Sequence, residues 1–197
     1  MVKESLIGGS VSQVKGESNA LTKVNCFTGQ DPSKWRRRIS TYNMVSLGEV
    51  YKGIELKLKA HGGNVEKLFY VKPGADPGRI RVRLDGVNAL TVNESGELEI
   101  ETDLGVMKFT KPVAYQEEKS KKTYVQVAYA VKGCEYGFDV DDFNRGKGLV
   151  IDPLLASTFF GGSYSDAAFS LSMDRDGNVY VAGHTVSSDF PTTPGAY

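Results

Sequence analysis

The stretch that decides the fold is Ala156–Tyr197, ASTFFGGSYSDAAFSLSMDRDGNVYVAGHTVSSDFPTTPGAY. Residues 169–173, FSLSM, alternate apolar and polar side chains, which is the pattern of a strand with one buried face. Residues 179–182, VYVA, form a β-branched and aromatic run that is typical of a second strand. Between them, DRDGN (174–178) combines turn-forming Asp and Asn side chains with a glycine that tolerates positive φ. The stretch therefore predicts a β-hairpin.

The sequence around this hairpin limits what it can pack against. Gly161-Gly162 ends an apolar, strand-like run over 154–160, and Pro191 and Pro194 are incompatible with a central strand. A two-stranded hairpin is marginally stable alone in water, so the unit has to pack against further strands. The order of strand, Gly-Gly corner, hairpin and Pro-rich exit is typical of one module in a repeating all-β array.

The same residues resemble a known family of repeats. FFGGS (159–163), DRDGNVYVAGHT (174–185) and SSDFPTTPGAY (187–197) occur here in the order seen in the SBBP-type repeats of bacterial extracellular β-propellers. The region from about Leu6 onward is similar to the uncharacterised β-rich domain that commonly precedes those repeats. The resemblance departs at Cys26, where an aromatic residue is usual, and in the lack of a secretion signal. Five segments carry the upstream resemblance: VNCFTGQDPSKWRRRISTY (24–42), VYKGIELKL (50–58), VKPGADPGRIRVRLDG (71–86), KPVAYQE (111–117) and LVIDPLL (149–155).

Strand patterns and resemblance together predict an all-β protein, with an antiparallel sandwich-like or meander domain followed by a partial β-propeller blade. We expect a polar N-terminal segment at 1–20, interpreted as a truncated domain start. A β domain of unknown function follows at 21–152, and a single incomplete repeat at 153–197. No segment has a sustained apolar period of 3.6 residues, so little helix is expected.

Charge and targeting signals exclude several classes of protein. The 24 Lys and Arg residues balance the 24 Asp and Glu residues, so no overall field favours nucleic acid or an anionic membrane. No run of about 18 apolar residues is present, so no membrane span is expected. The N-terminus lacks the apolar region of a signal peptide, which by itself predicts a cytoplasmic protein. The resemblance implies an extracellular or cell-surface parent instead, and we therefore expect this chain to be a fragment of a longer repeat protein.

Two clusters of basic residues suggest anion binding, and each has a simpler interpretation. In Arg79–Leu84, alternation puts Ile80, Val82 and Leu84 in the core and three arginines on the other face. This arginine ladder suits an acidic polysaccharide, but acidic partners such as those in Leu98–Glu101 favour an ordinary solvated sheet face. The run Ser33–Arg38, SKWRRR, suits nucleic acid through its cations and its indole. In a neutral chain, a solvated turn with Trp35 packed inward is favoured.

The sequence contains no recognisable catalytic constellation, so we expect no catalytic residue, no cofactor and no enzyme activity. His61 and His184 lack the paired spacing of a zinc site, and no serine lies in a nucleophile elbow. Weak calcium candidates are present, since Asp174, Asp176 and Asn178 have the 1-3-5 spacing of a calcium loop. The glutamate that would complete the loop is replaced by Thr185, which favours an ordinary hairpin turn.

Three functions stay open. The favoured one is a non-catalytic extracellular or cell-surface scaffold or adhesion module that contacts protein or glycan, with no nucleic-acid partner. The first alternative is a carbohydrate-binding module in which the aromatic residues Trp35, Tyr42 or Tyr51 are exposed and stack on sugars. The second alternative is a cell-envelope enzyme of the glycosidase type, which needs two carboxylates across a concave pocket. The open strand edges of an unclosed blade also favour self-association.

Overall fold

The computed structural model describes residues 2–27, 29, 31–61, 64–103, 105–119, 121–153, 164–173, 179–190 and 192. In this part of the chain the regular elements are β-strands, apart from the short 3₁₀ helices η1 (Pro32–Lys34) and η2 (Pro77–Arg79). The predicted all-β class is therefore confirmed. The chain divides into two compact units, one made of Met1–Lys15 and Ser46–Thr158 and the other of Gly16–Val45 and Phe159–Tyr197.

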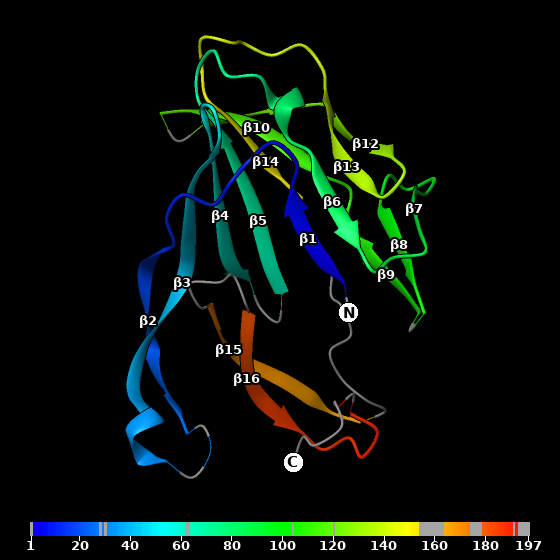
Figure 1. The fold of residues 1–197 in the computed structure, drawn as a ribbon. Coiled ribbons are helices and arrows are strands. Elements are labelled where there is room, and N and C mark those ends of the chain that lie inside the picture. Colours follow the sequence, from blue (N-terminus) through cyan, green and yellow to red (C-terminus); the bar gives the residue numbers. More distant parts are fainter. Residues whose placement is uncertain are drawn as a thin grey trace. The chain divides into compact units, whose positions relative to one another are not determined.

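The first unit contains a four-stranded and a three-stranded antiparallel sheet (Figure 1). The four-stranded sheet has the order β1-β6-β13-β12. Its strands are β1 (Lys3–Leu6), β6 (Val82–Asp85), β13 (Glu135–Val140) and β12 (Val127–Lys132). The three-stranded sheet is a meander of β7 (Ala89–Val92), β8 (Leu98–Thr102) and β9 (Gly105–Phe109).

A third, seven-stranded sheet has the order β11-β10-β14-β5-β4-β3-β2. Of these strands, β2 and the first part of β3 belong to the second unit, where they form a two-stranded ribbon. The strands are β11 (Lys121–Val125), β10 (Val113–Glu118), β14 (Leu149–Asp152), β5 (Asn64–Val71), β4 (Ile54–His61), β3 (Arg36–Tyr51) and β2 (Lys15–Cys26).

Aromatic contacts join the sheets of the first unit into a sandwich-like core. The rings of Phe69 on β5 and Phe138 on β13 have centroids 5.7 Å apart, and Tyr136 on β13 lies 6.0 Å from Phe109 on β9. Edge-to-face pairs of this kind contribute about 0.5–1.5 kcal/mol beyond the burial of their area. The largest fully buried side chains are Tyr136, Phe69, Ile54, Ile80, Leu84, Leu98, Ile100, Leu149 and Ile151.

Alternation in the sequence predicted the inward and outward faces of these strands. Strand β4 pairs antiparallel with β5 from Ile54↔Val71 to His61↔Asn64. Around β6, the apolar residues Ile80, Val82 and Leu84 are buried and the arginines between them are exposed. These faces follow from the two-residue period of an extended chain.

One strand prediction differs from the structure. The pattern predicts one strand over 124–131, but the structure divides this run between β11, which pairs with β10, and β12, which pairs with β13. Because β10 and β13 belong to different sheets, the chain changes sheet near Gln126, whose carbonyl accepts a hydrogen bond from Asp141 N at 3.0 Å. Inside the predicted polar N-terminal segment, residues 3–6 form β1 and pair with β6 from Lys3↔Asp85 to Leu6↔Val82.

A buried charge lies inside the first unit. Lys67 of β5 is 4% exposed; its ammonium donates to the hydroxyl of Tyr136 at 2.9 Å and forms an ion pair with Glu4 of β1. The ammonium also lies 5.6 Å from the ring centroid of Phe109 and 5.7 Å from that of Tyr136. Burial, with a smaller contribution from the Glu4 charge, raises the pKa of Tyr136 well above its ordinary value. The ion pair between Glu4 and the buried Lys67 therefore links β1 to β5, and Glu4 supplies the counter-charge that the buried ammonium needs.

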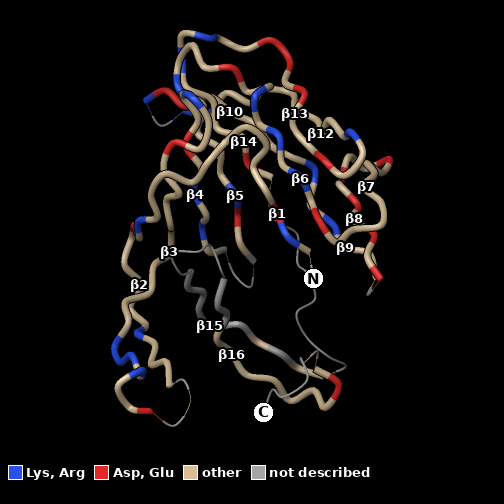
Figure 2. Tube along the Cα trace, viewed as in Figure 1, with Lys and Arg blue, Asp and Glu red and all other residues tan. Residues whose placement is uncertain are grey.

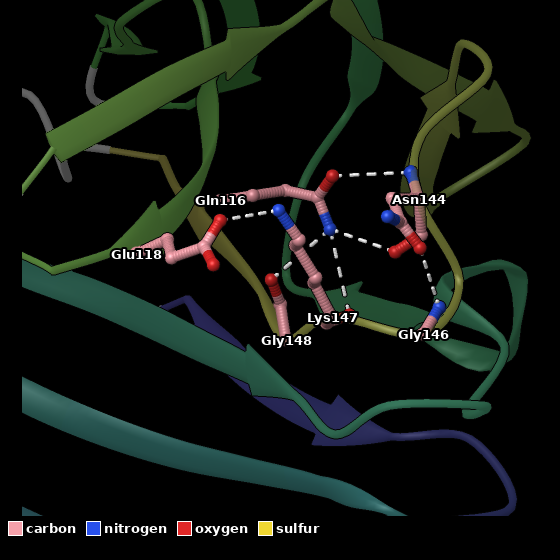
Figure 3. Close-up of polar contacts among 6 residues, drawn as sticks. All are labelled: Gln116, Glu118, Asn144, Gly146, Lys147 and Gly148. Carbon is pink, nitrogen blue, oxygen red and sulfur yellow. Dashed lines mark hydrogen bonds and ion pairs between the residues drawn. The ribbon is translucent and has the colours of Figure 1, made fainter.

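One buried amide orders the loop that precedes β14 (Figure 3). The side-chain oxygen of Gln116 on β10 accepts from Asn144 N at 3.0 Å, and its Nε2 donates to the carbonyls of Asn144 at 2.9 Å and Gly148 at 3.2 Å. Beside it, Lys147 and Glu118 form an exposed ion pair at 2.5 Å. Because Gln116 satisfies backbone groups with both ends of its amide, it fixes the loop to the sheet.

The second unit contains the predicted repeat hairpin as well as the β2–β3 ribbon. Strands β15 (Asp166–Met173) and β16 (Val179–Thr185) pair antiparallel, with a register shift between Ala168 and Ser170. The hairpin strands are thus present, while their predicted turn, 174–178, lies outside the described residues. In the ribbon, Thr41 Oγ1 donates to the carbonyl of Thr22 at 2.6 Å.

Candidate binding surfaces

The end of the β2–β3 ribbon positions Trp35, one of the predicted ligand-binding residues. Asp31 caps η1 by accepting a hydrogen bond from Ser33 N at 2.9 Å, and Pro32 opens the helix with its fixed φ. The hydrogen bonds from Ser33 lower the pKa of the Asp31 carboxyl. Trp35 closes the helix by donating its backbone N–H to the carbonyl of Pro32 at 3.2 Å, and β3 begins at the next residue. The tryptophan is therefore held at a defined place in the turn.

Trp35 is half-buried by residues of its own hairpin. Its indole Nε1 donates to the carbonyl of Gly29 at 3.1 Å, and its ring meets Phe27 edge to face with centroids 5.2 Å apart. The Arg37 guanidinium lies 5.8 Å from the Phe27 centroid and 5.9 Å from the Trp35 centroid. Phe27 remains 56% exposed. The two rings are therefore engaged with each other and with an arginine.

Cations surround these two rings. Lys34, Arg36, Arg37 and Arg38 are all exposed, and Figure 2 shows basic segments gathered at this end of the ribbon. In the described part of the chain, none of these four residues forms an ion pair with a carboxylate. We call this surface the basic tip: Lys34, Arg36, Arg37 and Arg38 together with Phe27 and Trp35.

The other two predicted aromatic residues have different surroundings. Tyr51 is buried in the first unit, where its hydroxyl donates to the carbonyl of Arg81 at 2.6 Å and accepts from Arg81 N at 3.2 Å. It lacks the exposure that sugar stacking needs, because its ring and hydroxyl connect β3 to the segment before β6. Tyr42 lies on the ribbon of the second unit, partly exposed, and packs over Gly16, where an added Cβ would come within 2.5 Å of the ring.

A row of tyrosines that sequence reasoning missed crosses the outer face of the seven-stranded sheet. Tyr124 of β11 is opposite Tyr115 of β10 in the pairing register. Tyr115 is in turn opposite Val150 of β14, and Val150 is opposite Tyr70 of β5. Directly opposed residues share one face of a sheet, and the residue before Tyr70, Phe69, points into the core. The row therefore points away from the core, with Tyr124 70% exposed. Alternation indicates the face of each tyrosine, but only the pairing register aligns them.

Two lysine ammonium groups lie over rings of this tyrosine row. The ammonium of Lys122 lies 3.8 Å from the ring centroid of Tyr115, and that of Lys57 lies 5.3 Å from the centroid of Tyr70. The hydrogen bond between Lys122 and Tyr115 raises the pKa of the lysine, and burial raises the pKa of Tyr70. The row thus presents phenol rings, hydroxyls and cations on one surface.

Two arginines of the ladder, Arg81 and Arg83, share one carboxylate within their own sheet. Arg81 and Arg83 contact the two carboxylate oxygens of Glu135 on β13 at 2.5 and 2.6 Å, which lowers the pKa of Glu135. The predicted acidic partner in Leu98–Glu101 is wrong, because β6 pairs with β13 and not with β8. Glu99 instead forms an ion pair with Lys108 on β9 at 2.8 Å.

An open groove of about 610 Å³ lies beside the ion pair of Arg83 and Glu135. Its lining residues include Asp85 and Glu135, together with Arg83, Lys132 and Cys134. A glycosidase acid needs a raised pKa, whereas the two arginines hold Glu135 in its ionised form. The chemistry of Glu135 is therefore that of a structural counter-ion.

The described residues contain no cluster of three or more His, Cys, Asp or Glu side chains able to hold a metal ion. The predicted calcium candidates Asp174, Asp176 and Asn178 lie outside the part of the chain that the structure describes. Within the described ranges, no helix has the length and apolar character needed to cross a membrane.

Comparison with known families agrees with this architecture. The family described as a domain of unknown function, DUF7948, matches residues 1–154, and the SBBP beta-propeller repeat matches residues 157–191. Both resemblances in the sequence are thereby confirmed. No curated protein and no solved structure matches the chain.

Proposed function

Because the chain belongs to the DUF7948 family of domains of unknown function and carries an SBBP β-propeller repeat, we propose that it is a non-catalytic scaffold or adhesion module of the bacterial cell surface. The observation that carries this proposal is the direct succession of the two matched regions, which end at residue 154 and begin at residue 157. A propeller repeat buries its apolar faces against neighbouring repeats, so a β domain directly before it supports the end of such an array.

The ionisable side chains of the first unit support a non-catalytic role. Glu135, Glu99 and Glu118 all have lowered pKa values because lysines or arginines bind their carboxylates. Such carboxylates serve as fixed counter-ions, while general acids and bases need pKa values shifted toward the working pH. The glycosidase alternative gains no support from these groups.

The cell-surface location is tested on intact bacteria that produce the parent protein. We expect protease added outside intact cells to degrade the protein while a cytoplasmic marker stays whole. Protection in intact cells, followed by digestion after lysis, would contradict the proposed location.

Carbohydrate binding is the second candidate, and the tyrosine row favours it. Tyr70, Tyr115 and Tyr124 present aromatic rings and hydroxyls across one sheet face, which suits the apolar and polar sides of a sugar chain. On a glycan array, Tyr124→Ala should weaken any binding at this face, while Tyr42→Ala on the ribbon should leave it unchanged. Binding that is lost only with Tyr42→Ala would assign it to the ribbon.

A further inference from the structure

We propose that the basic tip binds an acidic polysaccharide, with the guanidinium groups of Arg36, Arg37 and Arg38 contacting its carboxylates. Three features of the tip support this proposal. Its cations lack carboxylate partners among the described residues, its guanidinium groups can donate two parallel hydrogen bonds to one carboxylate, and the rings of Phe27 and Trp35 pack against Arg37. The choice of a polysaccharide as the polyanion rests on the proposed cell-surface role, whereas the recognition of carboxylates rests on the tip alone.

The positive charge of the tip is uncompensated in a chain with no net charge. Between Glu17 and Glu49 the sequence has five basic residues and a single acidic one, Asp31, whose carboxylate already accepts hydrogen bonds from Ser33. Elsewhere in the described chain, several lysines and arginines have carboxylate partners, and no other run of basic residues is as dense as residues 34–38. Such pairs include Lys59–Glu66, Lys67–Glu4, Lys72–Glu49, Arg81–Glu135, Arg83–Glu135, Lys108–Glu99 and Lys147–Glu118.

The donors of the tip suit carboxylates. A guanidinium presents parallel N–H groups that match a carboxylate in a two-point contact, and it keeps its charge at any physiological pH. Arg36 uses Nη1 to donate to the carbonyl of Ser33 at 3.3 Å, which restrains its side chain near the turn. Arg37 is restrained by its contacts with Phe27 and Trp35. Restraint before binding reduces the conformational entropy lost when a ligand is bound.

The aromatic residues of the tip disfavour nucleic acid as the partner. Single-stranded nucleic acid binds by stacking its bases on open ring faces along a charged groove. Phe27 and Trp35 instead meet edge to face, with an interplanar angle of 83°, and Arg37 lies over both rings. The rings therefore support the arginines, and the cations are what the tip presents to a ligand.

The test uses the full chain and polygalacturonate, a polymer with one carboxylate per sugar. Trp35 is the single tryptophan, so its fluorescence reports directly on the tip. We expect a saturable fluorescence change at low salt that weakens as salt is added. The double variant Arg36→Gln/Arg38→Gln should weaken binding by about tenfold or more, because it removes two charge-assisted contacts.

A matched control removes the same net charge from the arginine ladder. Arg81→Gln/Arg83→Gln should leave the affinity within about twofold, because those guanidinium groups already bind the carboxylate of Glu135. Circular dichroism of both variants checks that the strands persist. If the two double variants weaken binding equally, the attraction is non-specific and the proposal is overturned.

Binding of other ligands tests which class of polyanion the basic tip recognises. Neutral dextran should not bind, and single-stranded DNA or phosphatidylglycerol vesicles should bind more weakly than polygalacturonate. Binding to DNA or to vesicles without binding to polygalacturonate would overturn the proposal. A protein that proves to be intracellular but still binds polygalacturonate through the tip would refute the cell-surface role and leave the tip's chemistry intact.

Discussion

Lys67 shows how one residue type takes opposite roles in this protein. Inside the sandwich its ammonium is paired with Glu4, bonded to Tyr136 and placed over two aromatic rings. On the basic tip, Lys34 is exposed and has no carboxylate partner among the described residues. Lys67 lies in an apolar strand, where its charge is satisfied by the distant Glu4 and Tyr136.

Substitution of Glu4 should lower the free energy of unfolding more than substitution of Lys67. Glu4→Gln leaves a buried ammonium without a counter-charge and should lower the free energy of unfolding by about 2–4 kcal/mol. Lys67→Met keeps an apolar stem and leaves Glu4, whose side chain is 35% exposed, able to reach water, so we expect about 1 kcal/mol. Urea unfolding followed by circular dichroism measures both. A larger loss for Lys67→Met than for Glu4→Gln would show that the charge is not what holds β1.

Glu135 should make stability depend on pH in the acid range. Arg81 and Arg83 lower its pKa in the folded protein, so the ionised carboxylate stabilises the fold above the unfolded pKa, and this contribution is lost as pH falls through the folded pKa. The stability difference between the parent protein and Glu135→Gln should be constant above about pH 5 and shrink below about pH 4.3. Unfolding free energies measured across this range test it. A difference that stays constant to about pH 3 would exclude the linkage.

At the scale of elements, register decides which side chains become neighbours. Successive side chains of β10, β11 and β5 point to opposite faces of the sheet, so a shift of one residue in any pairing would remove its tyrosine from the row. The loop that precedes β14 is likewise ordered by Gln116, which comes from β10 and lies nearly thirty positions earlier in the chain.

Loss of the Gln116 amide should loosen this loop locally. Gln116→Met leaves Asn144 N and the carbonyls of Asn144 and Gly148 without their partner, so amide exchange over residues 144–148 should become faster. Glu118→Gln removes only the exposed ion pair with Lys147 and serves as the control, with exchange expected to stay the same. Equal exchange in the two variants would assign the order of the loop to other contacts.

At the scale of the whole molecule, the repeat hairpin forms the smallest sheet in the described part of the chain. Strands β15 and β16 pair only with each other among the described residues, which leaves a strand edge on each side of the hairpin. Exposed edges present unpaired backbone groups that another chain can complete. A propeller repeat placed beside further repeats would have these edges and faces covered.

The chain should therefore self-associate through this hairpin. Sedimentation equilibrium should show an average mass that rises with protein concentration. Leu171→Pro, which replaces a residue opposite Val181 in the ladder, should abolish the rise because proline removes a ladder donor and disrupts the hairpin. Tyr124→Pro on β11, an edge strand of the other unit, is the control. Association that is lost only with the control would place the contact on the sandwich.

Much of the fold was predictable because strands are recognised from the alternation of apolar and polar side chains in neighbouring residues. The buried positions of Ile54 and Leu56 and the inward set Ile80, Val82 and Leu84 all follow from neighbouring residues. The candidate sites were predictable only in part. The cations beside Trp35 are visible in the sequence, but nothing near Arg81 and Arg83 indicates that both pair with Glu135.

The sequence by itself determined the all-β class, the repeat hairpin and the position of the basic run, because a two-residue period and a turn composition need only adjacent residues. The tertiary structure decided which strands pair, that Tyr51 is buried, that three tyrosines align, and which arginines lack a carboxylate partner among the described residues. Those outcomes depend on pairings between strands far apart in the chain. Their physical reason is that register and ion pairing are settled when the sheets close around a common core, where one arrangement buries the apolar faces and satisfies the charges together.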